Sequence, residues 1–253
     1  MRLEYPGRYR LLVQDQKNHL MARSPIMNVF GEADKQEYIK RNGPPQFAMT
    51  GDLRVALWDD NAYGAKYIQQ VLNEDKRLDT AVIYKLTAEN LRNVQVLILP
   101  QPRRHQSLFK DEAMAKILSD YVKRGGGLLT THAMVGIREF VNAVPQVVQE
   151  PIHEAISSSF WKVSGQHPIV KGLPAELQKS TFGDMVGMKL AKGAVPLLVT
   201  EKGDCVMAAG SFGRGRYVPC GLGLAIGQKD RDCPPTDIEK TLLLNAIHWL
   251  GKK

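Results

Sequence analysis

The sequence is poor in cysteine and in long apolar runs, and each shortage argues against a class of protein. It has three cysteines, Cys205, Cys220 and Cys233, and no CxxC pair, so neither a disulfide framework nor a structural zinc site is expected. No window reaches the roughly 18 apolar residues that a membrane helix needs, and the first residues contain no apolar signal-peptide core. We expect a cytoplasmic protein with reduced thiols and no membrane partner.

Long basic runs are also missing, although the chain is basic overall. The 34 Lys and Arg residues outnumber the 26 Asp and Glu residues, which gives a net charge of +8. A nucleic-acid-binding protein would gather such charge into a stripe that contacts phosphates. The alternative is a solvated surface with a surplus of lysine, and the absence of any nucleic-acid motif favours it. We therefore expect no nucleic-acid partner.

The chain of 253 residues divides into two parts with different patterns. Residues 1–50 contain scattered charges and prolines, with only Tyr9–Val13 resembling a short strand. This segment has enough aromatic and aliphatic side chains to argue against a disordered tail, so we interpret it as an irregular N-terminal arm. Residues 51–253 are expected to form the main domain.

The main domain begins with apolar runs that alternate with amphipathic segments. Strands are expected at 53–58, 80–84, 94–100 and 128–131. Helices are expected at 63–73 and around Met114–Val122, where Gly125 follows the end of the helix, and a short helix at 87–93. This alternation is typical of a parallel sheet whose helices cover both faces. The predicted fold class is therefore α/β.

The second half of the chain is richer in β-structure. Strands are expected at 160–163, 194–200, 205–209 and 216–219, with turns at Gly203-Asp204 and Gly213-Arg214-Gly215. The last helix has a capping-box pattern, in which Thr236 is followed three residues later by Glu239.

Four segments in a fixed order carry a resemblance to a known family. They are Tyr121–His132 (YVKRGGGLLTTH), His167–Pro174 (HPIVKGLP), Phe212–Gly223 (FGRGRYVPCGLG) and Leu242–Leu250 (LLLNAIHWL). Together they resemble the ThuA-like branch of the class I glutamine amidotransferase-like superfamily. The resemblance spans residues 53–251 and implies a flavodoxin-like sheet with its site at the carboxyl ends of the strands.

The resemblance also implies that this chain lacks the amidotransferase nucleophile. Amidotransferases carry a cysteine at a sharp elbow after the fourth major strand, and the matching stretch here is Thr130-Thr131-His132-Ala133. ThuA-like proteins place a histidine after this strand, which His132 matches. They also tend to have a second histidine where this chain has Leu224. We expect no hydrolysis of glutamine, and we take His132 as the candidate catalytic or ligand-binding residue, with a capping or packing role as its alternative.

Other candidate ligand-binding residues also follow predicted strands. Asp59 and Asp60 could bind a cation or a sugar hydroxyl, but capping of the following helix by Asp60 or the next residue is the favoured alternative. Arg103 and Arg104 could bind an anion, and a solvated loop is the alternative. We expect Asp59, Arg103, His132 and the loop 224–233 to converge at one edge of the sheet, since each follows a strand that we interpret as parallel.

Two further motifs favour structural roles. The three glycines Gly125–Gly127 close a helix and open a strand, which is the reverse of the order in a phosphate-binding loop. Cys220 ends a strand, and a buried core cysteine is a commoner role there than a nucleophile.

Two functions are compatible with the sequence. The first is an amidotransferase-like domain without the nucleophile, which binds a small polar or anionic molecule or a partner subunit. The second is a ThuA-like enzyme that acts on a sugar or polyol through His132 and a strand-end carboxylate. No cofactor or metal is expected. We expect a homo-oligomer, because the apolar side chains of residues 1–50 must cover either their own domain or a neighbour.

Overall fold

The computed structural model describes residues 7–9, 12–14, 20–23, 27–29, 37, 41–59, 61–103, 112–137, 140–156, 158, 160–178, 185–227 and 231–252. The chain divides into two units, Met1–Gly43 and Pro44–Lys253. The boundary lies a few residues before the expected one because residues 44–50 contact the larger unit. In that stretch Phe47 packs against the core, and the carboxylate of Asp79 accepts from the N–H groups of Ala48, at 3.0 Å, and Met49.

The Met1–Gly43 unit is more regular than the expected arm. Its described strands are β1 (Gly7–Tyr9), β2 (Leu12–Gln14), β3 (Leu20–Arg23) and β4 (Met27–Val29). β2 pairs with β3 and β1 pairs with β4, both antiparallel, so the two pairs form nested hairpins. The predicted irregular arm is wrong in this respect. Backbone pairing between neighbouring strands needs no long apolar period, which explains why the sequence pattern did not reveal it.

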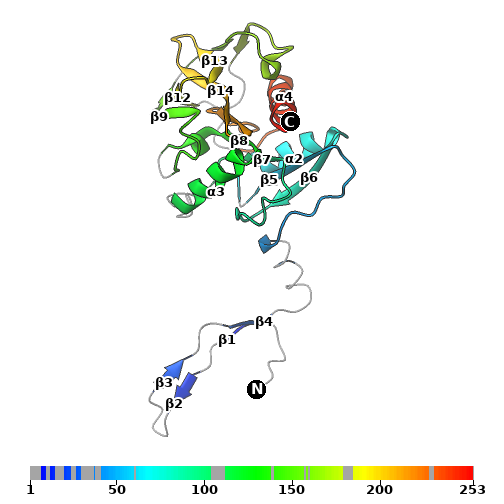
Figure 1. The fold of residues 1–253 in the computed structure, drawn as a ribbon, viewed down its shortest axis with the longest axis vertical. Coiled ribbons are helices and arrows are strands. Elements are labelled where there is room, and N and C mark those ends of the chain that lie inside the picture. The colour runs from blue at the N-terminus through cyan, green and yellow to red at the C-terminus, as the bar shows by residue number, and fades with distance from the viewer. Residues whose placement is uncertain are drawn as a thin grey trace. The chain divides into compact units, whose positions relative to one another are not determined.

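The Pro44–Lys253 unit is built on one sheet of eleven strands (Figure 1). Its parallel strands are β5 (Leu53–Trp58), β6 (Leu78–Ile83), β7 (Val96–Leu99), β8 (Gly127–Thr131) and β15 (Gly215–Cys220). They lie in the order β6-β5-β7-β8-β15, and each neighbouring pair is parallel. The strand order reverses between β5 and β7, which makes the crevice between these two strands the topological switch point.

The rest of the sheet is antiparallel, so the sheet is mixed rather than wholly parallel. Its strands are β9 (Val148–Ile156), β10 (Phe160–Val163), β11 (Glu176–Gln178), β12 (Met185–Leu190), β13 (Val195–Thr200) and β14 (Cys205–Phe212). β14 pairs with both β13 and β15 across the two predicted turns at Gly203 and Gly213. Such short connections can join only antiparallel neighbours, whereas parallel strands need a longer crossover. The sequence analysis did not foresee β9, β11 or β12.

Within its described residues, the Pro44–Lys253 unit has the helices α2 (Ala65–Glu74), α3 (Glu112–Lys123) and α4 (Asp237–Gly251), with short 3-10 helices η2 (His132–Val135) and η3 (Pro168–Val170). α2 contacts β5 and β6, α3 contacts β15, and α4 contacts β7, β8 and β15. The predicted capping box is confirmed, because Thr236 and Glu239 satisfy each other's backbone N–H groups at the start of α4. Within the described residues, no helix has the length and apolarity to cross a membrane.

The expected helix at 87–93 is wrong. The chain forms turns there, in which Thr87 Oγ1 accepts from the N–H of Asn90 at 3.1 Å. The local cap is present, but Asn90 also donates through its side chain to the carbonyl oxygen of Lys85. Side-chain bonds to nearby backbone groups compete with helix formation, so the segment stays a turn.

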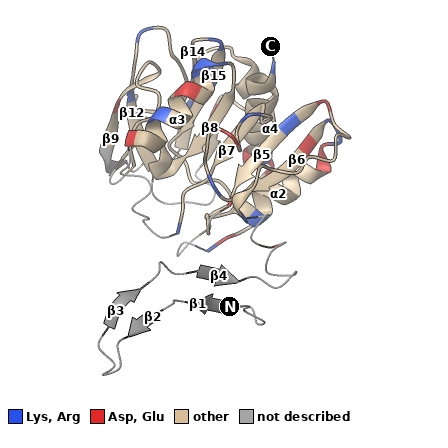
Figure 2. Ribbon diagram, turned by 60° about the horizontal axis from the view of Figure 1, so that its bottom comes forward, with Lys and Arg blue, Asp and Glu red and all other residues tan. Residues whose placement is uncertain are grey.

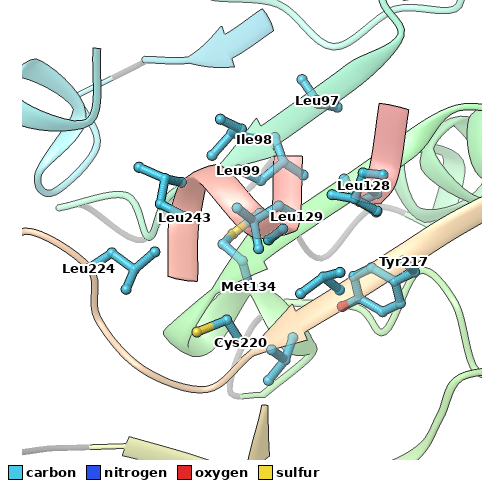
Figure 3. Packing of buried hydrophobic residues seen from close by; sticks show 14 of the residues in the cluster. Leu97, Ile98, Leu99, Leu128, Leu129, Met134, Tyr217, Cys220, Leu224 and Leu243 are labelled. Carbon is cyan, nitrogen blue, oxygen red and sulfur yellow. The ribbon is translucent and has the colours of Figure 1, made fainter. Parts of the chain in front are cut away.

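The core lies along the central parallel strands. Leu97, Ile98 and Leu99 of β7 and Leu128 and Leu129 of β8 are fully shielded from solvent (Figure 3). α4 approaches β8 closely, since a Cβ on Gly127 would lie 2.7 Å from the Cβ of Leu250. The predicted continuous apolar runs are thus buried on both sides, as expected for inner strands of an α/β sheet.

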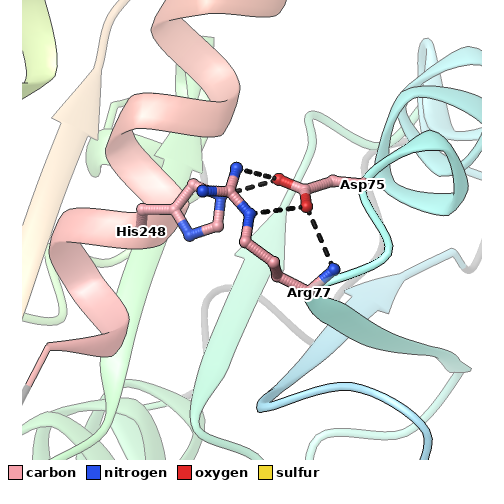
Figure 4. A network of polar contacts seen from close by, with 3 residues as sticks. All are labelled: Asp75, Arg77 and His248. Carbon is pink, nitrogen blue, oxygen red and sulfur yellow. Dashed lines mark hydrogen bonds and ion pairs between the residues drawn. The ribbon is translucent and has the colours of Figure 1, made fainter.

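A polar network joins α2 to α4 beside the amino ends of the parallel strands (Figure 4). Asp75, at the end of α2, accepts from Arg77 at 2.6 Å and lies 2.7 Å from Nε2 of His248 on α4. The hydrogen bond from Arg77 and, to a smaller degree, that from His248 hold the pKa of Asp75 well below its usual range, against the effect of its burial. The carboxylate therefore links the two helices in its charged form.

Candidate functional site at the carboxyl ends of the strands

The loops after β5 and β7 are bonded to each other at the switch point. The N–H of Tyr63 donates to the carbonyl oxygen of Gln101 at 2.7 Å, and the N–H of Arg103 donates to that of Asn61 at 2.9 Å. Ala62 and Pro102 form a bridge between these bonds. Backbone pairing therefore links the two loops that flank the switch point, where an open α/β sheet commonly binds its ligand.

Asp59 caps the first of these loops. Its carboxylate accepts from the N–H of Ala62 at 3.3 Å, and its own N–H donates to the carbonyl oxygen of Ile83 at 3.0 Å. Asp60, the other candidate carboxylate, lies outside the described residues. The favoured alternative for Asn61, capping of the next helix, is wrong, because α2 begins at Ala65 with Gly64 as its N-cap.

Gly64 is at this position because of a close approach by the chain after β15. Its φ is +69°, and a Cβ would lie 2.6 Å from the carbonyl oxygen of Leu224. The N–H of Gly64 donates to Asp232 at 2.9 Å. The loop after β15 therefore packs directly on the start of α2, and only glycine fits there without strain.

Arg103 is already paired at this edge. Its guanidinium forms an ion pair with Asp232 and lies over the ring of Tyr63, 4.6 Å from the ring centroid. The side chains of Arg103 and Asp232 are 33% and 25% exposed, so part of the pair is shielded from water. This pairing neutralises the positive charge of Arg103, which the sequence analysis considered as a binding group for an anion. Arg104 lies outside the described residues.

His132 occupies the elbow after β8. It is the first residue of η2, its φ is +47°, and only 1% of its surface is exposed. A left-handed backbone at a residue other than glycine is uncommon and is concentrated at functional turns. The preceding residue, Thr131, accepts through Oγ1 from the N–H of Gln101 at 3.2 Å, which connects the elbow to the loop after β7.

The surroundings of the elbow are apolar. Met134 of η2, Leu224 and Cys220 belong to the same apolar cluster as β7 and β8 (Figure 3). Leu224, at the position of the expected second histidine, is 4% exposed. Burial raises the pKa of the Cys220 thiol to about 12, so this cysteine is protonated at neutral pH. The interpretation of Cys220 as a core cysteine is confirmed.

The structure therefore connects Asp59, Arg103 and the loop 224–233 through shared hydrogen bonds, and connects His132 to them through Thr131 and Gln101. Among the described residues, no group of three or more His, Cys, Asp or Glu side chains could hold a metal ion. The sequence analysis missed Gln101 and Asp232. Asp232 could have been noticed, because it lies in the loop that was already expected at this edge, while nothing local marked Gln101.

Gln101 carries a polar atom whose hydrogen-bonding capacity is not met. Gln101 is 7% exposed, and its side-chain oxygen accepts no hydrogen bond from the residues that the structure describes. A buried acceptor without a donor costs free energy on the order of 1–3 kcal/mol. This oxygen lies in the loop after β7, at the switch point.

Comparison with known proteins identifies the fold. The chain has a ThuA-like fold. It is similar to a ThuA-like protein from Bacteroides uniformis ATCC 8492, with a TM-score of 0.57 and 15% identity over 82% of this chain and 94% of the other. It is also similar to a second ThuA-like protein, from Parabacteroides merdae ATCC 43184, with a TM-score of 0.52 and 13% identity over 80% of this chain and 90% of the other. A cytoplasmic protein from Salmonella typhimurium LT2 is similar with a TM-score of 0.58 and 13% identity over 79% of this chain and 100% of the other.

The sequence matches no protein-family model and no curated protein. At these identities the solved structures establish the fold alone. They confirm, at the level of the fold, the resemblance that the four sequence segments indicated.

Proposed function

We propose that the chain is an amidotransferase-like domain of ThuA-like fold that has no nucleophile and binds a small polar ligand at the carboxyl ends of its parallel strands. The observation that carries the proposal is the buried side-chain oxygen of Gln101, which has no donor in the described residues. A hydroxyl or amide group of a ligand would supply that donor. A partner subunit that inserts a polar side chain is the other form of the same proposal.

The fold supports the proposed location. Counted along the chain, the parallel strands lie in the order 2-1-3-4-5, which is the order of flavodoxin-like sheets. We propose this arrangement, with helices on both faces, as the frame of the site. Ligands of such sheets bind at the switch point, where Gln101, Tyr63 and Thr131 lie.

Thermal shifts with a panel of polyols, sugars and dicarboxylates would test the proposal on the wild type and on Gln101→Leu. We expect one class of compound to stabilise the wild type and to leave Gln101→Leu unchanged. The free Gln101→Leu protein should itself be more stable than wild type by about 1 kcal/mol, because it lacks the unsatisfied acceptor. Gln70→Leu, the same change at an exposed position of α2, is the matched control.

The absence of amidotransferase chemistry is tested separately. The purified protein should release no ammonia from glutamine, because His132 stands at the elbow and the thiol of Cys220 is protonated. Release of ammonia that survives stringent purification and is lost in Cys220→Ala would contradict the proposal.

The second candidate is a ThuA-like enzyme that acts on a sugar or polyol. It is favoured by the left-handed backbone of His132, because strain at an elbow often accompanies catalysis. Asp59 would be its carboxylate, with Asp60 as the alternative. Turnover of a panel sugar that disappears in His132→Gln, while the fold persists, would establish this candidate over the first.

We also propose a cytoplasmic homo-oligomer in which the Met1–Gly43 unit takes part in the contact. Light scattering should give a multiple of the chain mass for the full protein and a monomer for a chain that begins at Pro44. A monomeric full-length protein would contradict the proposed assembly. An unchanged oligomer after truncation would contradict only the proposed role of the Met1–Gly43 unit.

A further inference from the structure

Two adjoining cavities lie at the amino ends of the parallel strands, away from the site proposed above. The first, of about 560 Å³, is lined by Arg54, Arg92 and Arg124 among others. The second, of about 480 Å³, is lined by Arg124, Arg214, Arg216 and Lys252 among others. The two share Gln95, Arg124 and Gly125, so Arg124 stands at their junction. We call the six cationic residues the basic edge.

The charge of the basic edge is not neutralised within the described part of the protein, where none of its six side chains forms an ion pair. Among the described residues, Glu89 is the only acidic residue that lines the first cavity, and none lines the second. The hydrogen bond from Lys116, at 2.8 Å, is the main cause that lowers the pKa of Asp120, and the charge of Arg124 contributes less. The partner of Asp120 is therefore Lys116.

The arginines are held by neutral acceptors instead. Arg54 donates through Nε to the carbonyl oxygen of Asn93 at 2.7 Å, and Arg214 donates to that of Arg124 at 3.1 Å. Arg216 donates to the carbonyl oxygen of Trp249 and lies over its ring. A guanidinium has five N–H donors, so these bonds fix the side chains and leave donors for a ligand.

The backbone under the basic edge is held firmly. The hairpin turn between β14 and β15 bonds to the turn between α3 and β8, with Arg214 N–H donating to Lys123 at 3.1 Å and Arg216 N–H to Gly126 at 3.2 Å. A Cβ on Gly215 would lie 2.0 Å from the carbonyl oxygen of Val122, so these turns touch. The backbone positions of the arginines on both turns are thereby fixed before any ligand arrives, which lowers the entropic cost of binding.

The glycine-rich turn does not itself offer backbone donors. The N–H groups of Gly125, Gly126 and Gly127 donate to Val122, Tyr121 and Gln95 respectively. This confirms that Gly125–Gly127 is no phosphate-binding loop, and it means that an anion at this edge must be held by side chains.

We propose that the basic edge binds a small molecule with two phosphate groups, one in each cavity, with Arg124 between them. Each cavity has the size of a small-molecule site rather than of a groove for a macromolecule. A phosphate monoester carries nearly two negative charges at neutral pH, which suits six cations better than single-charged carboxylates do. Tyr121 is the only aromatic side chain among the lining residues that the structure describes, and it is 4% exposed, so these residues offer no platform on which nucleic-acid bases could stack.

The test is calorimetric titration of the full-length protein with sodium pyrophosphate, with citrate as the carboxylate comparison. We expect 1:1 binding of pyrophosphate in about 50 mM NaCl that weakens as salt is raised, because exposed charges are screened. Arg124→Gln should lower the affinity about tenfold or more, since it removes a charge-assisted bond to both groups. Arg214→Gln should lower it as well, and it replaces Arg124→Gln if that variant does not fold.

The control is Lys202→Ala, which removes the same charge from an exposed turn between β13 and β14 and should leave the affinity unchanged. No binding at millimolar pyrophosphate, or equal affinity in the wild type and both arginine variants, would overturn the proposal. Citrate binding as tightly as pyrophosphate would overturn the assignment to phosphate.

Discussion

The two edges of the parallel strands carry arginines in opposite settings. At the carboxyl edge Arg103 is paired with Asp232 and stacked on Tyr63, and the loops around it are bonded to one another. At the amino edge Arg124 and Arg214 line an open cavity. Arg214 donates to the carbonyl oxygen of Arg124, and neither side chain forms an ion pair with a residue that the structure describes. At the usual ligand edge of the fold, the positive charge of Arg103 is thus neutralised by Asp232, whereas the cationic side chains at the opposite edge have no acidic partner among the described residues. Location in a known fold therefore does not by itself tell which edge can bind an anion.

The largest effect expected from this comparison concerns packing. Gly64→Ala at the carboxyl edge should cost about 3–5 kcal/mol, because it adds backbone strain to an overlap with the carbonyl oxygen of Leu224. Gly125→Ala at the amino edge should cost only about 1–3 kcal/mol, because its φ is unfavourable but the nearest side-chain atom lies 3.8 Å away. Urea unfolding of both variants measures the difference. Equal costs would mean that the carboxyl edge is not the tighter of the two.

The next effect concerns Asp75, a well-paired carboxylate beside the amino edge. Asp75→Ala should lower the stability at pH 7 by about 1.5–3 kcal/mol, since the part-buried carboxylate of Asp75 accepts from the cationic Arg77 and lies within hydrogen-bonding distance of His248. The pKa of Asp75 is depressed in the folded state, so its contribution is complete above its unfolded pKa, near 4, and is lost as the pH falls further. The difference between variant and wild type should therefore shrink below pH 4. A difference that stays constant down to pH 2 would contradict the pairing.

A smaller effect separates the arginines of the two edges directly. Asp232→Asn keeps an acceptor for Gly64 but removes the charge that Arg103 faces, and it should cost about 0.5–1.5 kcal/mol. Arg214→Gln should be neutral or slightly stabilising, because it relieves repulsion from its cationic neighbours. Urea midpoints at low salt measure both changes. A clearly destabilising Arg214→Gln would show that the hydrogen bond to the carbonyl oxygen of Arg124 outweighs the repulsion and that the role of this arginine is structural.

The smallest expected effect concerns the reactivity of the three cysteine thiols. A thiol reagent at neutral pH should react with Cys233 before Cys205 and Cys220, since burial raises the pKa of each of the latter two to about 12. All three should react after unfolding. Early modification of Cys220 in the folded protein would mean that the carboxyl edge opens and that its thiol is accessible.

Local sequence patterns were sufficient to predict several strands and helices of the sheet-based unit. Leu53–Trp58 matches β5 to the residue, and the capping box places the start of α4, because an uninterrupted apolar run and a side-chain cap depend only on neighbouring residues. The elbow at His132 was also foreseen, since it follows an apolar strand in a segment of recognisable order. The antiparallel strands β9, β11 and β12 were not foreseen, because β11 pairs with β10 and β12 pairs with β9 across intervening segments, and no tight-turn signal in the sequence marks these pairings.

The two edges differ in how far the sequence could describe them. That strand ends would gather at one edge follows from parallel order alone, so Asp59, Arg103 and the loop 224–233 could be placed together in advance. The pairing of Arg103 with Asp232 and the burial of Gln101 required the tertiary structure, since they depend on how three loops fold over one another. The basic edge was invisible in the sequence, where Arg54, Arg124 and Arg214 lie in unrelated segments. Only the register of β15 against β8, together with the turns that this register holds in contact, brings those charges to one place.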